Sequence, residues 1–336
     1  MNLTQTKCPD CQCENIKQSR TYETINNGVR ILYKCEKCGK VFSETKGSFL
    51  EGLVKPIHLI IQALKARSEG TGFNAVCRIF GISKNTLLNW EEKFAGLKET
   101  LLLYALAFSF LQQIIEGDEL YTKIGKNVPV EDCEGWTIVL MERATRFIWA
   151  MKCGKKDRTL FLWAIQMLVL IVEKTGDLTL ITDGERSYGS ILFEICNEVV
   201  KTGARGRPPK VLRKGLKVRI KNKGSQSKKR GRKRAKYETP HREHPDTEQN
   251  IPTSEIHANH VEAFNAALRR NVSSYRRKTN TYAKETDALQ RVLDGYWIIH
   301  NFIKVHYTTR QVPAVALGIL EKGLSWEEVL MIQKTV

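Results

Sequence analysis

Two Cys-x-x-Cys pairs near the start of the chain constrain its fold more than any other feature. Cys8 and Cys11 form the first pair, Cys35 and Cys38 form the second, and 23 residues separate the pairs. Between them, Asn26-Asn27-Gly28 favours a tight hairpin turn, because an Asn-Gly step supplies positive φ angles. A module this small buries too little core to fold alone, so coordination of one metal ion would supply the missing folding energy. We therefore predict a zinc ribbon over residues 1–50.

The cysteine count and the apolar segments bear on where such a chain works. Nine cysteines are an odd number, and in a reducing compartment the paired spacing favours Zn²⁺ over disulfides. The alternative is a set of unrelated reduced cysteines, and Cys13 is left without a role. The start lacks the apolar stretch of a secretory signal, and no apolar run approaches the roughly 20 residues that span a bilayer. We expect an intracellular protein without a membrane partner.

A helical region over residues 51–100 has the pattern of a helix-turn-helix. Phe73 to Phe94 divides into two short helices around Gly81-Ile82-Ser83, where Gly81 permits a sharp turn and Ser83 can cap the second helix. Ordinary helical hairpins give a similar pattern, and this alternative remains open. In a DNA-binding motif, the exposed side of the second helix would face a DNA groove with Lys84, Asn85 and Asn89.

The middle of the chain is typical of an α/β domain. Strands are predicted over Gln113–Thr122, Trp136–Glu142, Phe147–Lys152 and Leu178–Thr182, with a helix over Arg158–Lys174 before the last of them. These elements give the first part of a core over residues 110–200. Helices predicted over Thr253–Asn271 and Thr286–His306 place the rest of the core helices in residues 251–336.

Three acids in this region could bind divalent cations. Asp118 lies on the first strand, Asp183 follows the fourth, and Glu262 lies on a following helix. Carboxylates from separate elements can hold two Mg²⁺ or Mn²⁺ ions, which activate an attacking oxygen and stabilise a leaving oxygen during phosphoryl transfer. Each acid also has a simpler interpretation: Asp183 precedes a glycine and could form a turn, while Asp118 and Glu262 could be solvated. Glu243 and Glu255 are rival third acids.

Three blocks around these acids resemble the catalytic blocks of bacterial DDE transposases, most nearly the insertion-sequence-one family. The blocks are Gly117–Tyr121, Thr182–Gly184 and His257–Asn265, and the resemblance covers most of the chain. It implies an RNase H-like catalytic domain, a mixed sheet flanked by helices, in which Asp118, Asp183 and Glu262 are magnesium ligands. Asn259 and Asn265, one turn either side of Glu262, would support these ligands or contact DNA.

The resemblance also implies an activity. Such an enzyme binds double-stranded DNA at the terminal inverted repeats of an insertion sequence, exposes 3′-hydroxyls and joins them to target DNA. It would work as a homodimer or a larger assembly on DNA in the bacterial cytoplasm, at the nucleoid. The chain departs from the family by carrying 78 residues between Asp183 and Glu262.

Most of the net charge of +18 falls in this insert. Residues 201–236 contain 17 Lys or Arg and no acid, so we expect residues 201–250 to form a basic and flexible segment. Arg205 and Arg207 lie in a Gly-Arg-Pro segment that resembles an AT-hook, which suits a narrow minor groove. The run over residues 228–234 would bind phosphates. Arg269, Arg270, Arg276 and Arg277 could hold the scissile strand, or could simply end a basic helix.

Two other functions fit parts of the pattern. A non-catalytic DNA-binding regulator would keep the zinc ribbon and the helix-turn-helix, although intact acids at all three positions argue against it. A structure-specific RNase H-like nuclease would cut branched DNA without joining strands. Strand-transfer products would distinguish the transposase from both.

Overall fold

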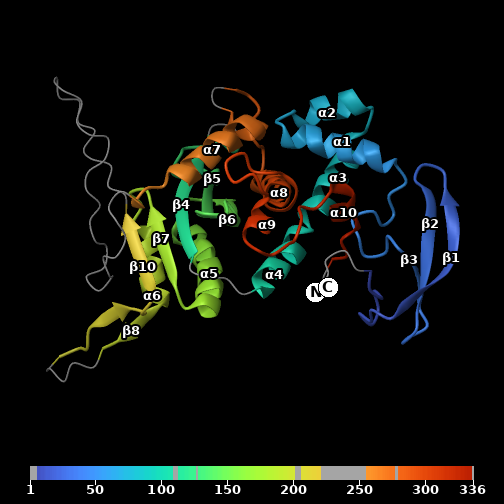
Figure 1. Cartoon of the computed structure of the whole chain (residues 1–336). Coiled ribbons are helices and arrows are strands. Elements are labelled where there is room, and N and C mark those ends of the chain that lie inside the picture. Colours follow the sequence, from blue (N-terminus) through green and yellow to red (C-terminus); the bar gives the residue numbers. More distant parts are fainter. Residues whose placement is uncertain are drawn as a thin grey trace. The chain divides into compact units, whose positions relative to one another are not determined.

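The structure is a computed structural model that describes residues 6–108, 113–125, 128–200, 206–220, 255–276 and 279–334. It divides into two compact units. The first unit comprises Met1–Ala107, Asn271–Ser273 and Arg291–Val336. The second comprises Phe108–Arg270 and Ser274–Gln290. Figure 1 labels the helices and strands of both units.

The first unit begins with a three-stranded antiparallel sheet in the order β1-β2-β3. The strands are β1 (Ile16–Thr24), β2 (Gly28–Cys35) and β3 (Val41–Ser43). Thr24 pairs with Gly28, so the predicted hairpin turn is present, and Gly28 has the positive φ of 67° that this turn requires.

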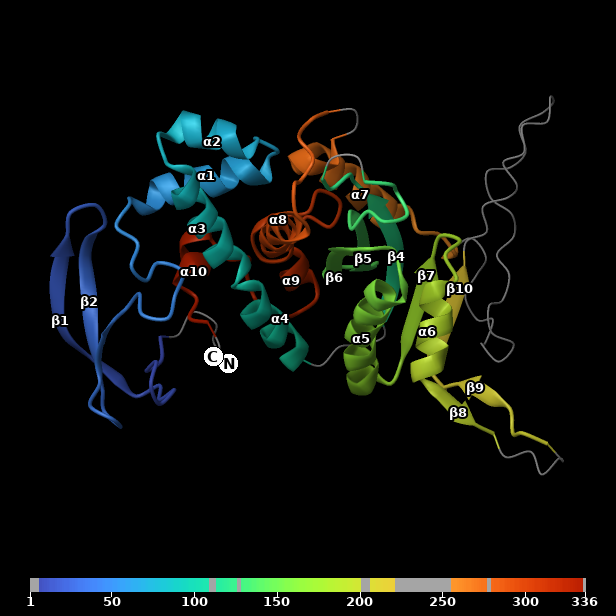
Figure 2. The ribbon, with the colours of Figure 1, turned by 180° about the vertical axis from the view of Figure 1, so that it is seen from behind.

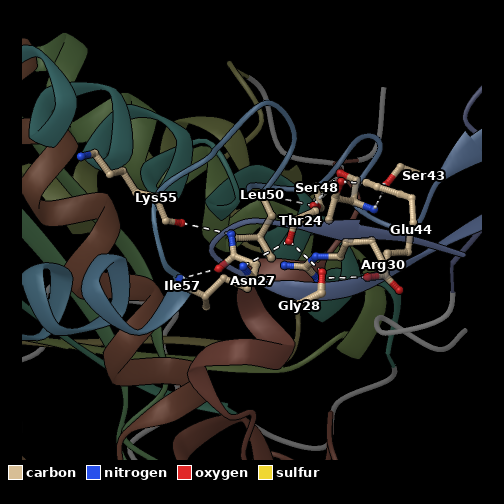
Figure 3. A network of polar contacts seen from close by, with 12 residues as sticks. Thr24, Asn27, Gly28, Arg30, Ser43, Glu44, Ser48, Leu50, Lys55 and Ile57 are labelled. Atoms are coloured by element: carbon tan, nitrogen blue, oxygen red, sulfur yellow. Dashed lines mark hydrogen bonds and ion pairs between the residues drawn. The ribbon is translucent and has the colours of Figure 1, made fainter.

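The tip of this hairpin is fixed to the segment before the first helix (Figure 3). Asn27 Oδ1 accepts a hydrogen bond of 2.9 Å from the backbone N–H of Ile57, and Asn27 Nδ2 donates to the carbonyl of Lys55 at 3.2 Å. Asn26 Nδ2 also donates to the carbonyl of Val54, at 2.7 Å. The Asn-Gly turn therefore both reverses the chain and satisfies backbone groups at the start of a helix.

The remainder of the first unit is helical. Its elements are α1 (Ile57–Ser68), α2 (Phe73–Phe80), α3 (Lys84–Ala95), α4 (Lys98–Ala107), the last part of α8 (Thr286–Ile298), the π-helical turn Ile299–Ile303, α9 (Pro313–Ala316) and α10 (Trp326–Met331). Buried aromatic rings fill the core, and Phe94 stacks on Trp326 with the ring centroids 5.6 Å apart. As predicted, α2 ends at Gly81, with φ 62°, and the side chain of Ser83 caps α3 by accepting from Thr86 N–H.

The C-terminal residues pack with the N-terminal sheet. Gln333 Nε2 donates to the carbonyls of Lys7 and Lys46, at 3.1 and 2.9 Å, and Gln333 Oε1 accepts from Lys7 N–H at 2.7 Å. The sequence grouped residues 251–336 as one region following the insert, whereas the structure divides them between the two units.

A five-stranded mixed sheet forms the centre of the second unit, in the order β10-β7-β4-β5-β6. The strands are β4 (Gln113–Tyr121), β5 (Trp136–Glu142), β6 (Ile148–Gly154), β7 (Leu178–Thr182) and β10 (Leu216–Ile220). β4 pairs parallel with β7, which pairs parallel with β10, while β5 runs antiparallel to both β4 and β6. A separate two-stranded antiparallel sheet is formed by β8 (Asn197–Val199) and β9 (Lys210–Leu212).

Helices flank this sheet, because strands such as β5 and β7 consist almost entirely of buried residues and need cover on both faces. α5 (Arg158–Thr175) begins at Asp157, whose side chain accepts from Thr159 and Leu160 N–H, and α6 (Ser187–Ile195) packs beside it (Figure 2). A Cβ on Gly117 of β4 would lie 3.7 Å from the Tyr188 ring of α6. Glu116 and Asp118, on the opposite face of β4, bond to α7 (Asn259–Asn271).

Some predicted bounds differ from those observed. The helix predicted over Thr253–Asn271 begins only at Asn259, and residues 256–258 are not helical. The helix predicted over Thr286–His306 is α8 followed by the π-helical turn. Most of the basic insert, including the run over residues 228–234 and Glu243, lies outside the described residues. Among the helices that the structure describes, none combines the length and the apolar character needed to cross a bilayer.

Candidate functional site

The four predicted zinc ligands come together in the first unit. The sulfur atoms of Cys8, Cys11, Cys35 and Cys38 all lie within 4.8 Å of one another. Cys8 Sγ lies 3.5 Å from Cys38 Sγ, and Cys11 Sγ lies 3.6 Å from Cys35 Sγ. A tetrahedral ion with metal–sulfur bonds of about 2.3 Å places its sulfur atoms about 3.8 Å apart, so the cluster has nearly the required size.

Both cysteine pairs have the same backbone geometry. In the first, Gln12 N–H donates to the Cys8 carbonyl at 2.9 Å, and in the second Gly39 N–H donates to the Cys35 carbonyl at 3.0 Å. The residue after each pair has a positive φ, 56° at Gln12 and 75° at Gly39. Two matched loops therefore aim their thiols at one point, and the backbone N–H of Cys38 lowers the pKa of the Cys35 thiol to about 6. Cys13 lies outside the four-sulfur group.

Two of the three predicted catalytic acids are neighbours on the adjacent interior strands β4 and β7 of the second unit's sheet, Asp183 being the residue that follows β7. Gly117 of β4 is paired with Thr182 of the parallel strand β7. The next residues are Asp118 and Asp183, and paired strands lie about 4.8 Å apart, so these carboxylates leave adjacent strands side by side. Burial, the charge of Glu119 and the charge of Asp183 raise the pKa of Asp118 to about 6. A bound cation would relieve this repulsion.

Helix α7 brings an amide to the first of these carboxylates, that of Asp118. Asn265 Nδ2 donates to Asp118 Oδ2 at 2.8 Å. Asn265 is only 2% exposed, and within the described parts of the chain its Oδ1 has no hydrogen-bond partner. A buried amide oxygen without a partner, on a side chain bonded to the Asp118 carboxylate, is a type of ligand that a hard cation prefers. The residues present therefore fit a divalent cation.

The third predicted acid lies one turn before Asn265 on α7. Glu262 is half-buried, and its position three residues before Asn265 puts it on a neighbouring part of the helix surface. Asp118, Asp183 and Glu262 do not form a group with all ligand atoms within 4.8 Å among the described residues. Asn259, at the start of α7, is exposed, and the rival Glu255 is also exposed.

A lysine neutralises part of the acidic charge on the other face of β4. Lys156 Nζ lies 3.1 Å from Glu119 Oε2 and 3.0 Å from Glu185 Oε2. Burial nevertheless raises the pKa of Glu119, and the buried Tyr188 ring of α6 packs on this face. These acids are thus held in a partly desolvated setting, where charges interact strongly.

The structure also reveals a buried carboxylate that no sequence motif singled out. Glu116, two residues before Asp118, is fully buried and forms a group with His257 and His260 whose ligand atoms lie within 4.8 Å of one another. The alternation of side chains along a strand puts Glu116 on the same face as Asp118, which is the signal that could have identified it. These residue types could bind a metal, but hydrogen bonds from Arg143, His260 and Val261 already occupy the Glu116 carboxylate.

The predicted DNA contacts are mostly at the surface. Lys84, Asn85 and Asn89 on α3 are exposed, as are Arg207, Arg270 and Arg276, while Arg269 is half-buried. Arg276 donates to the Arg270 carbonyl at 3.4 Å. Arg205 and Arg277 lie outside the described residues.

Comparison with known proteins adds no assignment. Neither the protein-family models nor the curated proteins compared with this sequence match it.

Proposed function

We propose that this chain is a DDE-type DNA transposase of an insertion sequence. The observation that carries the proposal is the pairing of Gly117 with Thr182, which sets Asp118, within β4, beside Asp183, the residue that follows the parallel strand β7. Ligands of α/β sheets gather at such carboxyl ends. Helix α7, which carries Glu262 and Asn265, is bonded to the same strand.

The architecture supports an RNase H-like assignment. The resemblance implies a mixed sheet flanked by helices, and the second unit has one antiparallel strand, β5, within an otherwise parallel sheet. Under this proposal the three acids, which come from β4, from the turn after β7 and from α7, would converge on one site although they lie far apart in the sequence. This is the arrangement that a two-cation site needs.

The chain's own residues would have distinct roles in the reaction. Asp118, Asp183 and Glu262 would hold two Mg²⁺ or Mn²⁺ ions, and Asn265 would orient Asp118 through its 2.8 Å hydrogen bond. When bound, such ions supply activation of the attacking oxygen and stabilisation of the leaving oxygen. The reaction would be hydrolysis at the element's ends and then transfer of the new 3′-hydroxyls to target DNA, in which one phosphodiester replaces another.

The first unit would recognise DNA. The four cysteines fit Zn²⁺, whose preferred geometry is tetrahedral with sulfur ligands, so we assign a zinc ribbon here. α2 and α3 would act as a helix-turn-helix, with the exposed side of α3 in the major groove at the terminal inverted repeats. Arg207 and the basic insert would add phosphate and minor-groove contacts, and two copies would hold the two ends.

The deciding experiment is a strand-transfer assay with the full chain, Mg²⁺ and a duplex copied from the DNA that borders the chain's own coding sequence. The proposal predicts cleavage at the duplex ends and covalent joining to a second duplex. Cleavage without joining would indicate a nuclease, and binding without either reaction would indicate a regulator.

DNA reading by α3 gives a separate prediction. Replacing Lys84 with alanine should weaken binding to all sequences alike and lower the slope of log affinity against log salt by about one, because one phosphate contact is lost. Replacing Asn89 with alanine should instead reduce discrimination between matched and mismatched ends by about 1–3 kcal/mol, if Asn89 contacts a base edge. Fluorescence anisotropy over a salt series measures both. Equal behaviour of both variants and wild type would exclude α3 from the interface.

A further inference from the structure

The buried carboxylate of Glu116 caps helix α7 from a neighbouring strand. Glu116 Oε2 accepts from the backbone N–H groups of His260 and Val261, at 3.0 and 3.1 Å. These are among the first N–H groups of α7, which have no partner within their own helix, and a negative charge is favourable at that end. Glu116 therefore attaches the start of α7 to β4.

The other carboxylate oxygen binds two further donors. Glu116 Oε1 lies 2.7 Å from Arg143 Nε and 2.7 Å from His260 Nδ1. Arg143 also donates from Nη1 to the Glu255 carbonyl at 2.7 Å and from Nη2 to the His257 carbonyl at 2.5 Å. One guanidinium thus joins β4 to the segment that leads into α7.

These contacts argue against a metal at Glu116, His257 and His260. A carboxylate offers about four acceptor positions, and the four donors named above occupy them. Arg143 also carries a permanent positive charge, and this charge would repel a metal cation bound to the same carboxylate oxygen. The hydrogen bonds from His260 and Val261 and the charge of Arg143 outweigh the effect of burial and lower the pKa of Glu116.

The two attachments of α7 fit the spacing of the strand. Glu116 and Asp118 are two residues apart, which is about 6.8 Å along β4. Their partners on α7, His260 with Val261 and then Asn265, are four to five residues apart, which is about 6–7.5 Å along a helix. Glu262 lies between these attachments. The position of Glu262 along β4 is therefore fixed by one contact before it on α7 and one contact after it.

We infer that Glu116 is the positioning residue of the acidic site: by capping α7 and binding Arg143, it holds Glu262 and Asn265 in place beside Asp118. This inference rests on the proposed function for the role of those residues. The alignment of α7 on β4 itself rests only on the contacts above. Partners that orient metal ligands commonly change metal affinity or activity by about 10–100-fold when replaced.

The test compares full-length variants. Glu116→Gln keeps an acceptor for the two α7 amides but loses the charge that binds Arg143, whereas Glu116→Leu loses both. Glu91→Gln is the matched control, because Glu91 is also a buried glutamate, 2.5 Å from Arg67 Nε, but lies in the first unit. We expect Mn²⁺ affinity to fall about tenfold in Glu116→Gln and about 100-fold in Glu116→Leu, with the control within about twofold of wild type.

A second measurement does not depend on metal or activity. Hydrogen exchange at the amides of His260 and Val261 should be faster in Glu116→Leu and unchanged in Glu91→Gln. Wild-type exchange rates in Glu116→Leu, or wild-type Mn²⁺ affinity in both Glu116 variants, would overturn the inference. Equal losses in the Glu91 control would also overturn it. Failure of wild type itself to bind Mn²⁺ would refute the proposed function, and the exchange rates would still decide whether Glu116 holds α7.

Discussion

Removal of zinc is expected to unfold the N-terminal sheet, β1 to β3, while the second unit stays folded. The buried core of this module consists of Cys8, Cys35 and Phe42, with only partly buried neighbours around them. Such a core cannot offset the entropy of ordering the strands. Structural zinc in small modules contributes an apparent binding free energy of about 10–16 kcal/mol. This exceeds the free energy of unfolding expected for so small a module, so the module should unfold when zinc is removed.

Serine substitutions separate the metal from general packing. Cys35→Ser should release Zn²⁺, lower its content from about one per chain and remove hydrogen-exchange protection in β1 and β2. Cys13→Ser is the matched control, because Cys13 packs on the same core but lies outside the four-sulfur group. Elemental analysis and hydrogen exchange measure both effects. A full loss of zinc in Cys13→Ser, or a folded sheet in zinc-free protein, would contradict the assignment.

Replacing Asp183 with asparagine is expected to lower Mg²⁺-dependent cleavage by about a thousandfold. The substitution keeps the shape of the side chain but removes one charge beside Asp118. Metal catalysis supplies several kcal/mol of transition-state stabilisation, and each 1.36 kcal/mol is a factor of ten in rate. The change should appear in single-turnover cleavage of the element's end.

Asp177 provides the control for this variant. It precedes β7, at the end of the strand opposite to Asp183. Asp177→Asn should leave the cleavage rate within about twofold of wild type, since charges far from a site contribute little. Cleavage by Asp183→Asn at the wild-type rate would show that this carboxylate holds no catalytic ion.

Local patterns in the sequence predicted much of the fold. β5 and β7 have the predicted bounds, and the hairpin turn, the α2–α3 break and the Ser83 cap are present. Each of these depends on residues a few positions apart, through side-chain periodicity, an Asn-Gly step or a capping hydroxyl. The clustering of the four cysteine thiols was also predicted, because two Cys-x-x-Cys pairs in a short module are a strong indication of a metal site.

Contacts between distant residues could not be predicted in the same way. The bond from His260 to Glu116 and the bond from Asn265 to Asp118 depend on how α7 packs on the sheet, more than 100 residues after β4 in the sequence. The same holds for Gln333, which joins the C-terminus to the first module. Asn259, at the other end of the predicted pair around Glu262, is exposed rather than buried. Asn259 and Asn265 are both about one helical turn from Glu262 in the sequence. Only the packing of α7 on the sheet shows that Asn265 is buried and Asn259 is exposed.

The most direct test of the central claim is a crystal of the full chain with Mn²⁺ and a duplex of its element's end, examined by anomalous scattering. The proposal predicts two manganese peaks about 3.5–4 Å apart, bound by Asp118, Asp183 and Glu262. Manganese bound only at Glu116 and the two neighbouring histidines, or no manganese at these three acids, would contradict it.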